Sequence, residues 1–319
     1  MDKKPRIYIA GHRGLAGSAI VRELQHQGYT NLVTRTHAEL DLEDPMATQR
    51  FFEQEKPEIV FLAAAKVGGI HANNTYPVDF LMSNLLIEAN ICRAAHASKV
   101  NRLIFLGSSC IYPRDCPQPI KEEYLLTGPL EATNRPYALA KIAGIEMCWS
   151  YNRQYGTKWL AAMPTNLYGP GDNYDLNNSH VLPALIRKMH EAKISGAAEV
   201  VLWGSGKPMR EFLYVDDLAN GLVFLATMDQ PTYDRLTAST QCPLINIGTG
   251  TDQTIRELAE TVAKVVGYQG RFVQDTSKPD GTMRKVMDVS RIQALGWKAA
   301  TGLEQGVAQT YRSYLETFA

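Results

Sequence analysis

The stretch that decides the fold is Arg6-Ile-Tyr-Ile-Ala10-Gly11-His-Arg-Gly14-Leu-Ala-Gly17, near the start of the chain. The apolar run before Gly11 predicts a short strand, and a helical pattern follows from Leu15 to about Gln27. Between them lie three glycines spaced Gly-x-x-Gly-x-x-Gly. Glycine lets the backbone approach a diphosphate, and the following helix presents free N–H groups and a positive dipole end to that anion. The stretch therefore predicts the strand, turn and helix of a dinucleotide-binding unit.

The rest of the first 165 residues alternates apolar strands with helical segments. Strands are expected at 59–62, 103–106 and 160–163, and helices near 45–54, 79–98 and 137–155. This alternation predicts an α/β fold, a Rossmann-type parallel sheet doubly wound by helices. After Pro164 we expect helices at 180–191, 216–228 and 254–266 and strands at 200–203 and 244–247. We therefore predict a cofactor-binding Rossmann domain over 1–165 and a smaller, mainly substrate-binding C-terminal lobe over 166–319, with about 210–250 also contributing to the first.

Composition is that of a globular enzyme. The 319 residues are 45% hydrophobic and 21% charged, which is enough for a large core. Lys+Arg 33 balances Asp+Glu 33, so no overall basic field indicates nucleic acid. A strand that begins by Arg6 leaves no room for a signal peptide, and no apolar run is long enough to cross a membrane. These features predict a cytoplasmic protein that binds neither nucleic acid nor membrane.

The cysteines are an odd set of five without a Cys-x-x-Cys pair. This pattern argues against a disulfide framework and against a zinc cage. We expect no metal site, and any functional cysteine should act as a thiol.

Tyr137-Ala-Leu-Ala-Lys141 places a phenol and an ammonium one helical turn apart on the same face. A nearby cation favours the phenolate and is expected to lower the pKa of the tyrosine toward neutrality, where it can exchange a proton with a carbonyl oxygen. The spacing occurs by chance on many helices. Here it accompanies Gly107-Ser-Ser-Cys110-Ile-Tyr-Pro113 directly after a predicted strand, which is where ligands collect in an open parallel sheet. Ser108 can donate a hydrogen bond to a substrate carbonyl.

With this Ser-Tyr-Lys set, the sequence resembles the extended short-chain dehydrogenase/reductase family along essentially its whole length. Further motifs carry the resemblance: Asp41-Leu42, Ala63-Ala-Ala-Lys66, and Arg210-Glu-Phe-Leu-Tyr-Val-Asp216-Asp217. The resemblance implies a nicotinamide cofactor. The second predicted strand, near Leu32-Val33-Thr34, does not end in an acidic residue that would bind a ribose diol. Arg13, Arg35 and His37 instead lie close to that position and suit a 2′-phosphate, which favours NADP(H) over NAD. The implied cofactor-binding residues are Gly11, Arg13, Gly14, Leu15, Gly17, Arg35, His37, Asp41, Leu42, Ala63, Leu106, Gly107, Lys141, Pro164, Asn166, Leu167 and His180.

Many reactions share this scaffold, so the branch must be inferred from residues that differ. Sugar-nucleotide 4,6-dehydratases would carry Thr-Asp-Glu where this chain has Ser108-Ser109-Cys110, and hexose 4-epimerases would lack the thiol. The sequence is most similar to a branch that epimerises C3 and C5 of GDP-4-keto-6-deoxy-D-mannose and then reduces C4. That resemblance implies five catalytic residues: Ser108, Cys110, Tyr137, Lys141 and His180.

The chemistry of those residue types agrees with the implied roles. A 4-keto group acidifies the hydrogens on C3 and C5, so a base and an acid across the ring can invert both centres. Cys110 and His180 titrate near enough to neutrality to serve, and which of them acts as base at each step stays open. NADPH is expected to reduce C4 while Tyr137 protonates the oxygen.

The substrate-binding residues implied by the resemblance are Ser108, Lys188, Trp203, Arg210, Asp280 and Lys285. The family's arginine on the helix falls on Lys188 here, and the arginine after the second strand falls on His37. Two alternatives stay open: a GDP-L-colitose type of reaction on a 3-deoxy analogue, and a non-catalytic NADP-sensing module. Relatives also suggest a homodimer in which helices 79–98 and 137–155 form a four-helix interface.

Overall fold

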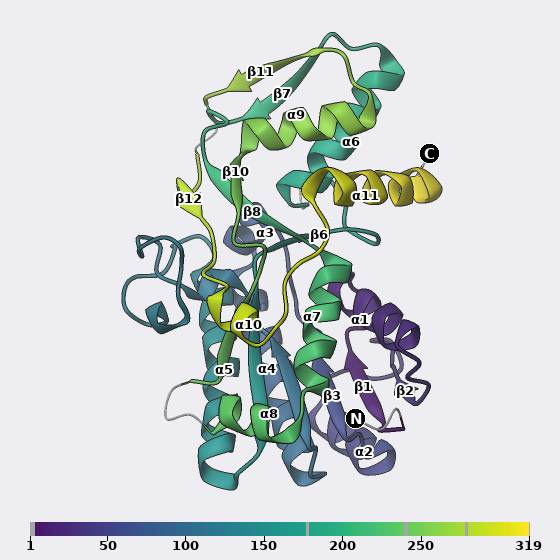
Figure 1. The fold of residues 1–319 in the computed structure, drawn as a ribbon, viewed down its shortest axis with the longest axis vertical. Helices are drawn as coiled ribbons and strands as arrows, with labels where there is room; N and C mark the ends of the chain where they lie inside the picture. The colour runs from purple at the N-terminus through teal and green to yellow at the C-terminus, as the bar shows by residue number, and fades with distance from the viewer. Residues whose placement is uncertain (1–3, 177–178, 239–241, 278–279, 319) are drawn as a thin grey trace.

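The computed structural model describes residues 4–176, 179–238, 242–277 and 280–318. A six-stranded parallel sheet forms the lower part of the molecule in Figure 1, with strand order β2-β1-β3-β4-β5-β9. This confirms the predicted Rossmann-type α/β fold. The strands are β1 (Ile7–Ala10), β2 (Leu32–Val33), β3 (Ile59–Leu62), β4 (Arg102–Leu106), β5 (Lys158–Pro164) and β9 (Leu244–Ile247). Their near-complete burial is typical of a parallel sheet that helices cover on both faces.

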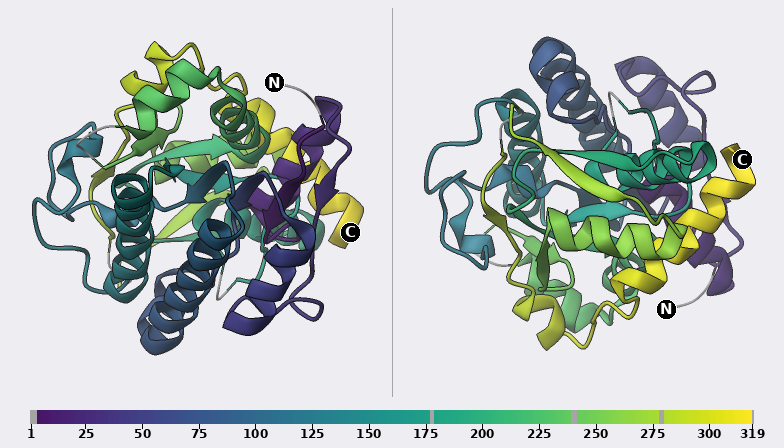
Figure 2. Two further views of the ribbon diagram at one scale, coloured as in Figure 1. Left: turned by 90° about the horizontal axis from the view of Figure 1, so that it is seen from below. Right: turned by 90° about the horizontal axis from the view of Figure 1, so that it is seen from above.

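Helices cover the two faces of this sheet. On one face α4 (Pro77–Ala97) packs against both α5 (Arg135–Tyr155) and α2 (Pro45–Glu55), and α1 (Leu15–His26) packs against α7 (Val215–Thr227) on the other (Figure 2). Shorter helices complete this half of the molecule: α3 (Ile70–Thr75), η1 (Ser109–Ile111), η2 (Glu122–Tyr124), α8 (Gln230–Thr237) and α10 (Ser290–Ala294).

The upper lobe has a second hydrophobic core of its own. Helices α6 (Val181–Ser195), α9 (Ile255–Val266) and α11 (Leu303–Phe318) pack together beside the two-stranded sheet of β7 (Glu199–Trp203) and β11 (Arg271–Asp275). Between the two halves, β8 (Met209–Tyr214) pairs with β6 (Asn166–Tyr168), β10 (Asp252–Thr254) and β12 (Arg284–Lys285). Figure 1 shows these strands at the junction of the lobes.

A buried carboxylate on β8 ties this junction together. Glu211 accepts hydrogen bonds from the backbone N–H groups of Thr249 at 2.6 Å, Gly250 at 2.8 Å and Met287 at 2.7 Å. These bonds compensate for removing the carboxylate from water. They attach the loop after β9 and the segment after β12 to β8, and so fix the position of Lys285.

Among the described residues, no helix is long and apolar enough to cross a membrane. No group of three or more histidine, cysteine or acidic side chains gathers there as a metal site. The five cysteines are all free thiols.

Candidate active site

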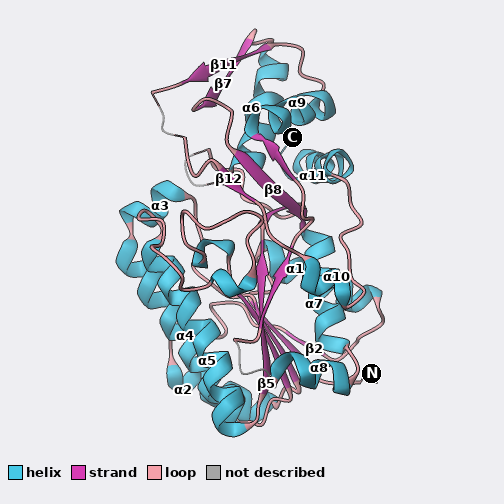
Figure 3. Cartoon of the chain, turned by 60° about the vertical axis from the view of Figure 1, so that its left-hand side comes forward, coloured by secondary structure: helices cyan, strands magenta, loops and turns pink. Residues whose placement is uncertain are grey.

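Backbone segments that end or follow four strands meet at the upper edge of the parallel sheet. Gly11 follows β1 and Ala63 follows β3. Leu106 is the last residue of β4, Gly107 comes directly after it, and Pro164 is the last residue of β5. Figure 3 shows this edge facing the second lobe. In an open parallel sheet, the carboxyl ends of the strands are the place where ligands bind.

The glycine turn after β1 is packed so tightly that only glycine fits at two of its three positions. Gly11 has φ of +85°, and a Cβ there would lie 2.7 Å from the Ala64 nitrogen. A Cβ on Gly17 would lie 2.1 Å from the Gly11 carbonyl oxygen. Gly14, by contrast, is exposed at the N-cap of α1, where a Cβ would make only an ordinary contact with the Gly11 carbonyl oxygen at 3.4 Å, and this exposure permits close approach of an anion to the helix N-terminus. Leu15 begins the helix.

The side chains that the sequence assigned to a 2′-phosphate come from two loops: Arg35 and His37 follow β2, and Arg13 lies in the turn between β1 and α1. Arg35 is ion-paired with Glu55 of α2 and donates to the Thr34 carbonyl oxygen at 2.8 Å. Arg13 and His37 are exposed, and the His37 Nδ1 lies 3.8 Å from Asp41 Oδ1. Leu42 is buried beneath them in the core. Arg35 is therefore already held in an ion pair in this structure, whereas the Arg13 side chain is exposed.

Ser108 and Cys110 occupy the sharp turn where β4 passes into η1. Gly107 packs closely against Met163, because a Cβ on this glycine would lie 1.8 Å from the Met163 methyl group and would require that side chain to move. The Ser108 hydroxyl oxygen accepts a weak hydrogen bond from the Cys110 N–H at 3.4 Å and so caps η1. The thiol of Cys110 is buried, with 8% of the residue exposed.

Tyr137 lies in the first turn of α5, with its ring edge-to-face against Phe80 of α4 at a centroid distance of 6.2 Å. Burial raises the pKa of its phenol well above the ordinary value, the neighbouring Cys110 and Glu88 raise it further, and a hydrogen bond with the Ser108 side chain lowers it. Ser108, Cys110 and Tyr137 are thus brought together as the sequence predicted. At neutral pH the phenol keeps its proton.

The expectation that Lys141 lowers the pKa of Tyr137 is wrong for this structure. The Lys141 Nζ lies 3.2 Å from Glu88 Oε1, donates to the Leu106 carbonyl oxygen at 3.1 Å, and lies 5.9 Å from the centre of the Tyr137 ring. Its charge is compensated by the glutamate, so burial dominates the pKa of the phenol.

Cys110 lies in a cationic environment. Burial raises the pKa of its thiol, while the charges of Lys285 and Lys141 and a hydrogen bond with Ser108 lower it. Lys285 itself is paired in register with Arg210 across β12 and β8. Burial lowers the pKa of Lys285, the charge of Cys110 raises it, and the charge of Arg210 lowers it. The lysine that the sequence assigned to the substrate therefore also acts on the thiol.

His180 is the N-cap residue of α6, in the second lobe. Its side chain has solvent access, yet the surrounding protein atoms lower the pKa of the imidazole. Within the described part of the chain, no hydrogen bond or ion pair joins this imidazole to Cys110 or Tyr137. The imidazole is therefore neutral at pH 7 and can accept a proton.

The remaining predicted substrate residues line the second lobe. The Lys188 Nζ lies over the indole of Trp203, 4.9 Å from the ring centre, and Trp203 is 59% exposed. The Asp280 carboxylate accepts hydrogen bonds from the N–H and hydroxyl of Ser205, which stabilise the turn between β7 and β8. Asn166 donates to the Glu211 carbonyl oxygen at 2.8 Å and, with Leu167 beside it, belongs to β6 at the lobe junction.

The sequence model of the NAD-dependent epimerase/dehydratase family matches residues 7–236. The chain belongs to this family. Membership confirms the resemblance to the extended short-chain dehydrogenase/reductases.

Individual members of the epimerase/dehydratase family match nearly the whole chain. GDP-L-fucose synthase of Escherichia coli strain K12 is 56% identical, covering 98% of this chain and 97% of its own. GDP-L-colitose synthase of Yersinia pseudotuberculosis is 39% identical, covering 97% and 98%. The structure of a GDP-D-glycero-L-gluco-heptose synthase from Campylobacter jejuni, determined in the presence of NADPH, has a TM-score of 0.92 and 39% identity, covering 99% of both chains.

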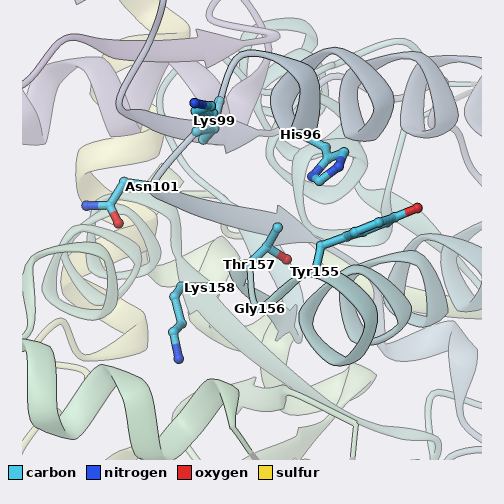
Figure 4. A pocket seen from close by; sticks show the side chains of 8 residues that line it. His96, Lys99, Asn101, Tyr155, Gly156, Thr157 and Lys158 are labelled. Atoms are coloured by element: carbon cyan, nitrogen blue, oxygen red, sulfur yellow. The ribbon is translucent and has the colours of Figure 1, made fainter.

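A shallow hollow of about 280 Å³ lies away from the carboxyl-terminal edge of the parallel sheet (Figure 4). Its lining includes His96, Lys99, Tyr155 and Lys158, from the ends of α4 and α5 and the start of β5. Because β5 starts at the opposite edge of the sheet from Pro164, this hollow is remote from Ser108 and Tyr137.

Sequence reasoning missed Glu88, the acidic partner of Lys141. A signal was present, because Phe80, Asn84, Glu88 and Cys92 recur every fourth residue on α4 and are all buried. An acidic residue on the buried face of a helix requires a partner.

Proposed function

We propose that this chain is a GDP-L-fucose synthase, which epimerises C3 and C5 of GDP-4-keto-6-deoxy-D-mannose and reduces C4 with NADPH. Three findings support the proposal: full-length identity of 56% to a protein of that name, the Ser108-Tyr137-Lys141 set, and the thiol beside it. The observation that carries it is the placement of Cys110 against Ser108 and Tyr137, because a simple reductase or 4-epimerase has no use for a thiol there.

The cofactor site fits a dinucleotide. The two sterically obligatory glycines shape a turn at the N-terminus of α1, and Gly14 is exposed at that N-terminus, where a diphosphate could approach the backbone. Arg13, Arg35 and His37 would hold the 2′-phosphate that distinguishes NADP, and Lys141 would hold the nicotinamide ribose. When bound, the reduced cofactor supplies the hydride that C4 receives.

The chain's own residues handle the protons. Cys110 and His180 remove and return protons at the carbons that flank the ketone, which inverts C3 and C5 through enolates. Ser108 then donates a hydrogen bond to the oxygen on C4, and Tyr137 gives its proton to the same oxygen. Because Tyr137 is a phenol at neutral pH, the resting site is prepared for reduction.

In the second lobe, Arg210, Lys188 and Lys285 are the cations available for the diphosphate of GDP. Desolvation lowers the pKa of all three. A bound diphosphate would favour the protonated forms of these side chains and offset their desolvation, so the cluster should favour substrate binding. Trp203 offers an exposed aromatic face to the nucleotide or sugar. The hydrogen bond from Ser205 to Asp280 holds the Asp280 carboxylate at the turn that follows Trp203.

The proposal is tested by product identification. Purified protein is incubated with NADPH and GDP-4-keto-6-deoxy-D-mannose, and the ring configuration of the product is read by NMR. We expect GDP-L-fucose. Exclusive turnover of the 3-deoxy analogue would instead establish the colitose type of reaction, and NADPH oxidation that no keto sugar stimulates would favour a sensing module.

We propose further that the enzyme is a homodimer joined through α4 and α5. Val78, Met82 and Leu86 lie four residues apart along α4 and are 68%, 46% and 38% exposed. The spacing gathers them into one apolar stripe, and α5 adds Leu139, which is 45% exposed. A second copy related by a twofold axis would bury this surface in a four-helix interface.

Light scattering tests the dimer. We expect a mass of twice the 35.5 kDa of one chain. A Met82→Glu variant should shift the protein toward monomer, because it places a charge in the apolar stripe, while the charged-surface control Glu260→Gln should leave the mass unchanged. A monomeric wild-type protein at micromolar concentration would exclude the interface.

A cytoplasmic location stays a prediction from the sequence.

A further inference from the structure

Glu88 is a completely buried acidic residue on the face of α4 that packs against α5, behind the catalytic tyrosine. Its Oε1 lies 3.2 Å from the Nζ of Lys141, and the two side chains are 1% and 2% exposed. Apart from this ion pair, neither carboxylate oxygen has a hydrogen-bond partner within the described residues. A buried carboxylate with so few partners is costly, and a buried charge pair beside a reactive group is a candidate for a functional role.

Gly144 makes room for this carboxylate. It lies one turn beyond Lys141 in the interior of α5, where glycine is unfavourable to a helix. A Cβ at this position would lie 2.8 Å from Glu88 Oε2 and 2.3 Å from the Phe105 ring. The glycine therefore lets α5 pack closely against both the Phe105 ring and the glutamate, which is an observation independent of the charge of Glu88.

The surroundings of the pair are dry and contain few other ionisable groups. From α5 the groups that interact electrostatically with Glu88 are Lys141, Tyr137 and Cys148, and its own helix adds Cys92. Strand β4 adds the Phe105 ring, 4.8 Å from the Lys141 Nζ, and the Leu106 carbonyl oxygen. Burial raises the pKa of Glu88 to about 7, and Lys141 lowers it.

We propose that Glu88 is a positioning residue that keeps Lys141 protonated and oriented behind Tyr137, and that its negative charge adds to the effect of burial in keeping Tyr137 in the phenol form that C4 reduction requires. This inference rests on the proposed function, in which Tyr137 is the proton donor.

The expected effect of removing the charge follows from electrostatics. A buried ammonium without a counter-charge tends to lose its proton, which would remove the cation that stabilises the phenolate formed during reduction. If the ammonium instead keeps its proton, its uncompensated charge lowers the pKa of Tyr137. The active state has both Lys141 and Tyr137 protonated. Either change makes one of them lose its proton at a lower pH, so both move the basic limb of the pH profile to lower pH.

The test uses Glu88→Gln in the full-length enzyme, with the rate of keto-sugar-dependent NADPH oxidation measured against pH. We expect the basic limb to move down by about one pH unit or more. Glu88→Asp keeps the charge at a shorter reach and should move it less. The matched control is Glu122→Gln, because Glu122 is also buried and ion-paired, at 3.3 Å from Arg291, but lies outside the site. It should lower stability without moving the limb.

Gly144→Ala is a second variant, because its methyl group crowds both the carboxylate and the Phe105 ring while the number of charges is unchanged. It should move the limb in the same direction as the glutamine variant but less far, because the charge is displaced and not removed. A glutamine variant that folds and retains the wild-type pH profile would overturn the role of Glu88.

Lysine titration in the cofactor-free protein separates this inference from the proposed function. NMR of ¹³Cε-labelled lysine, with Lys141→Met to assign the signal, should show a lower titration midpoint for Lys141 in Glu88→Gln. An unchanged midpoint would contradict the proposed charge pairing. A wild-type protein that oxidises no NADPH with any keto sugar overturns the proposed function instead, and the lysine titration still decides whether Glu88 controls Lys141.

Discussion

Cys110→Ser should suppress the exchange of the C3 and C5 hydrogens with solvent deuterium by about 100-fold or more, the scale of a lost acid or base. A serine hydroxyl is similar in size to a thiol but is a far weaker acid, so near neutral pH it neither ionises to act as a base nor readily gives up its proton. The substitution therefore removes proton transfer at carbon without opening a cavity. Exchange is measured by NMR of the keto sugar in D₂O without NADPH, so that reduction does not contribute.

Two comparisons make this result specific to the thiol. Cys116→Ser, in the loop that follows, should leave exchange at the wild-type rate, because Cys116 has no part in the proposed chemistry. The Cys110 variant should also lose exchange before it loses reduction, because Ser108 and Tyr137 remain in place. Wild-type exchange in the Cys110 variant would remove the thiol from the mechanism.

The pKa of the Cys110 thiol depends on a residue that the sequence did not connect with it. Burial raises that pKa, so the thiol is protonated at neutral pH. The charge of Lys285, on β12, limits the rise and makes the thiol a better proton donor. From the sequence, Lys285 was assigned only to substrate binding. Its proximity to Cys110 could not be predicted, because β12 is two residues long and pairs with β8, which is distant in the chain. No local pattern predicts such a pairing.

Local patterns account for the parts of the fold that the sequence predicted. The apolar runs at Ile59–Leu62 and Leu244–Ile247 are bounded by polar or turn residues, and both became strands with the expected limits. The glycine turn was recognisable because its spacing reflects steric limits, as the close approach of Gly17 to the Gly11 carbonyl oxygen shows. These features depend on neighbours a few residues away.

Features that depend on distant neighbours were not predicted. Strand β8, Met209–Tyr214, mixes charged and apolar residues because its pairing partners β6, β10 and β12 come from three separate regions. The spacing of Tyr137 and Lys141 correctly placed both on α5, but the direction of the tyrosine pKa shift was wrong. That error arose because Glu88, which compensates the lysine, lies on another helix. Sequence spacing reveals which groups share a face, not which charges are compensated.

Tyr137→Phe should reduce NADPH oxidation by about 100-fold to 10,000-fold while hydrogen exchange at C3 and C5 remains detectable. The phenol is the proton donor to the oxygen on C4, and phenylalanine keeps the ring against Phe80 but cannot donate. Proton transfer at carbon uses Cys110 and His180, so it does not require the phenol. Reduction is followed by the absorbance of NADPH, and exchange by NMR in D₂O.

The control for this variant is Tyr112→Phe. Tyr112 is also buried, and its hydroxyl donates to Asn246 Oδ1 at 2.6 Å outside the proposed chemistry. Losing that hydrogen bond should cost about 1 kcal/mol of stability and leave reduction intact. Equal loss of exchange and reduction in Tyr137→Phe would refute the division of labour, because it would mean that the phenol also takes part in proton transfer at carbon. Unequal loss would instead show that one pocket separates two reactions, with the thiol and imidazole acting at carbon and the phenol at oxygen.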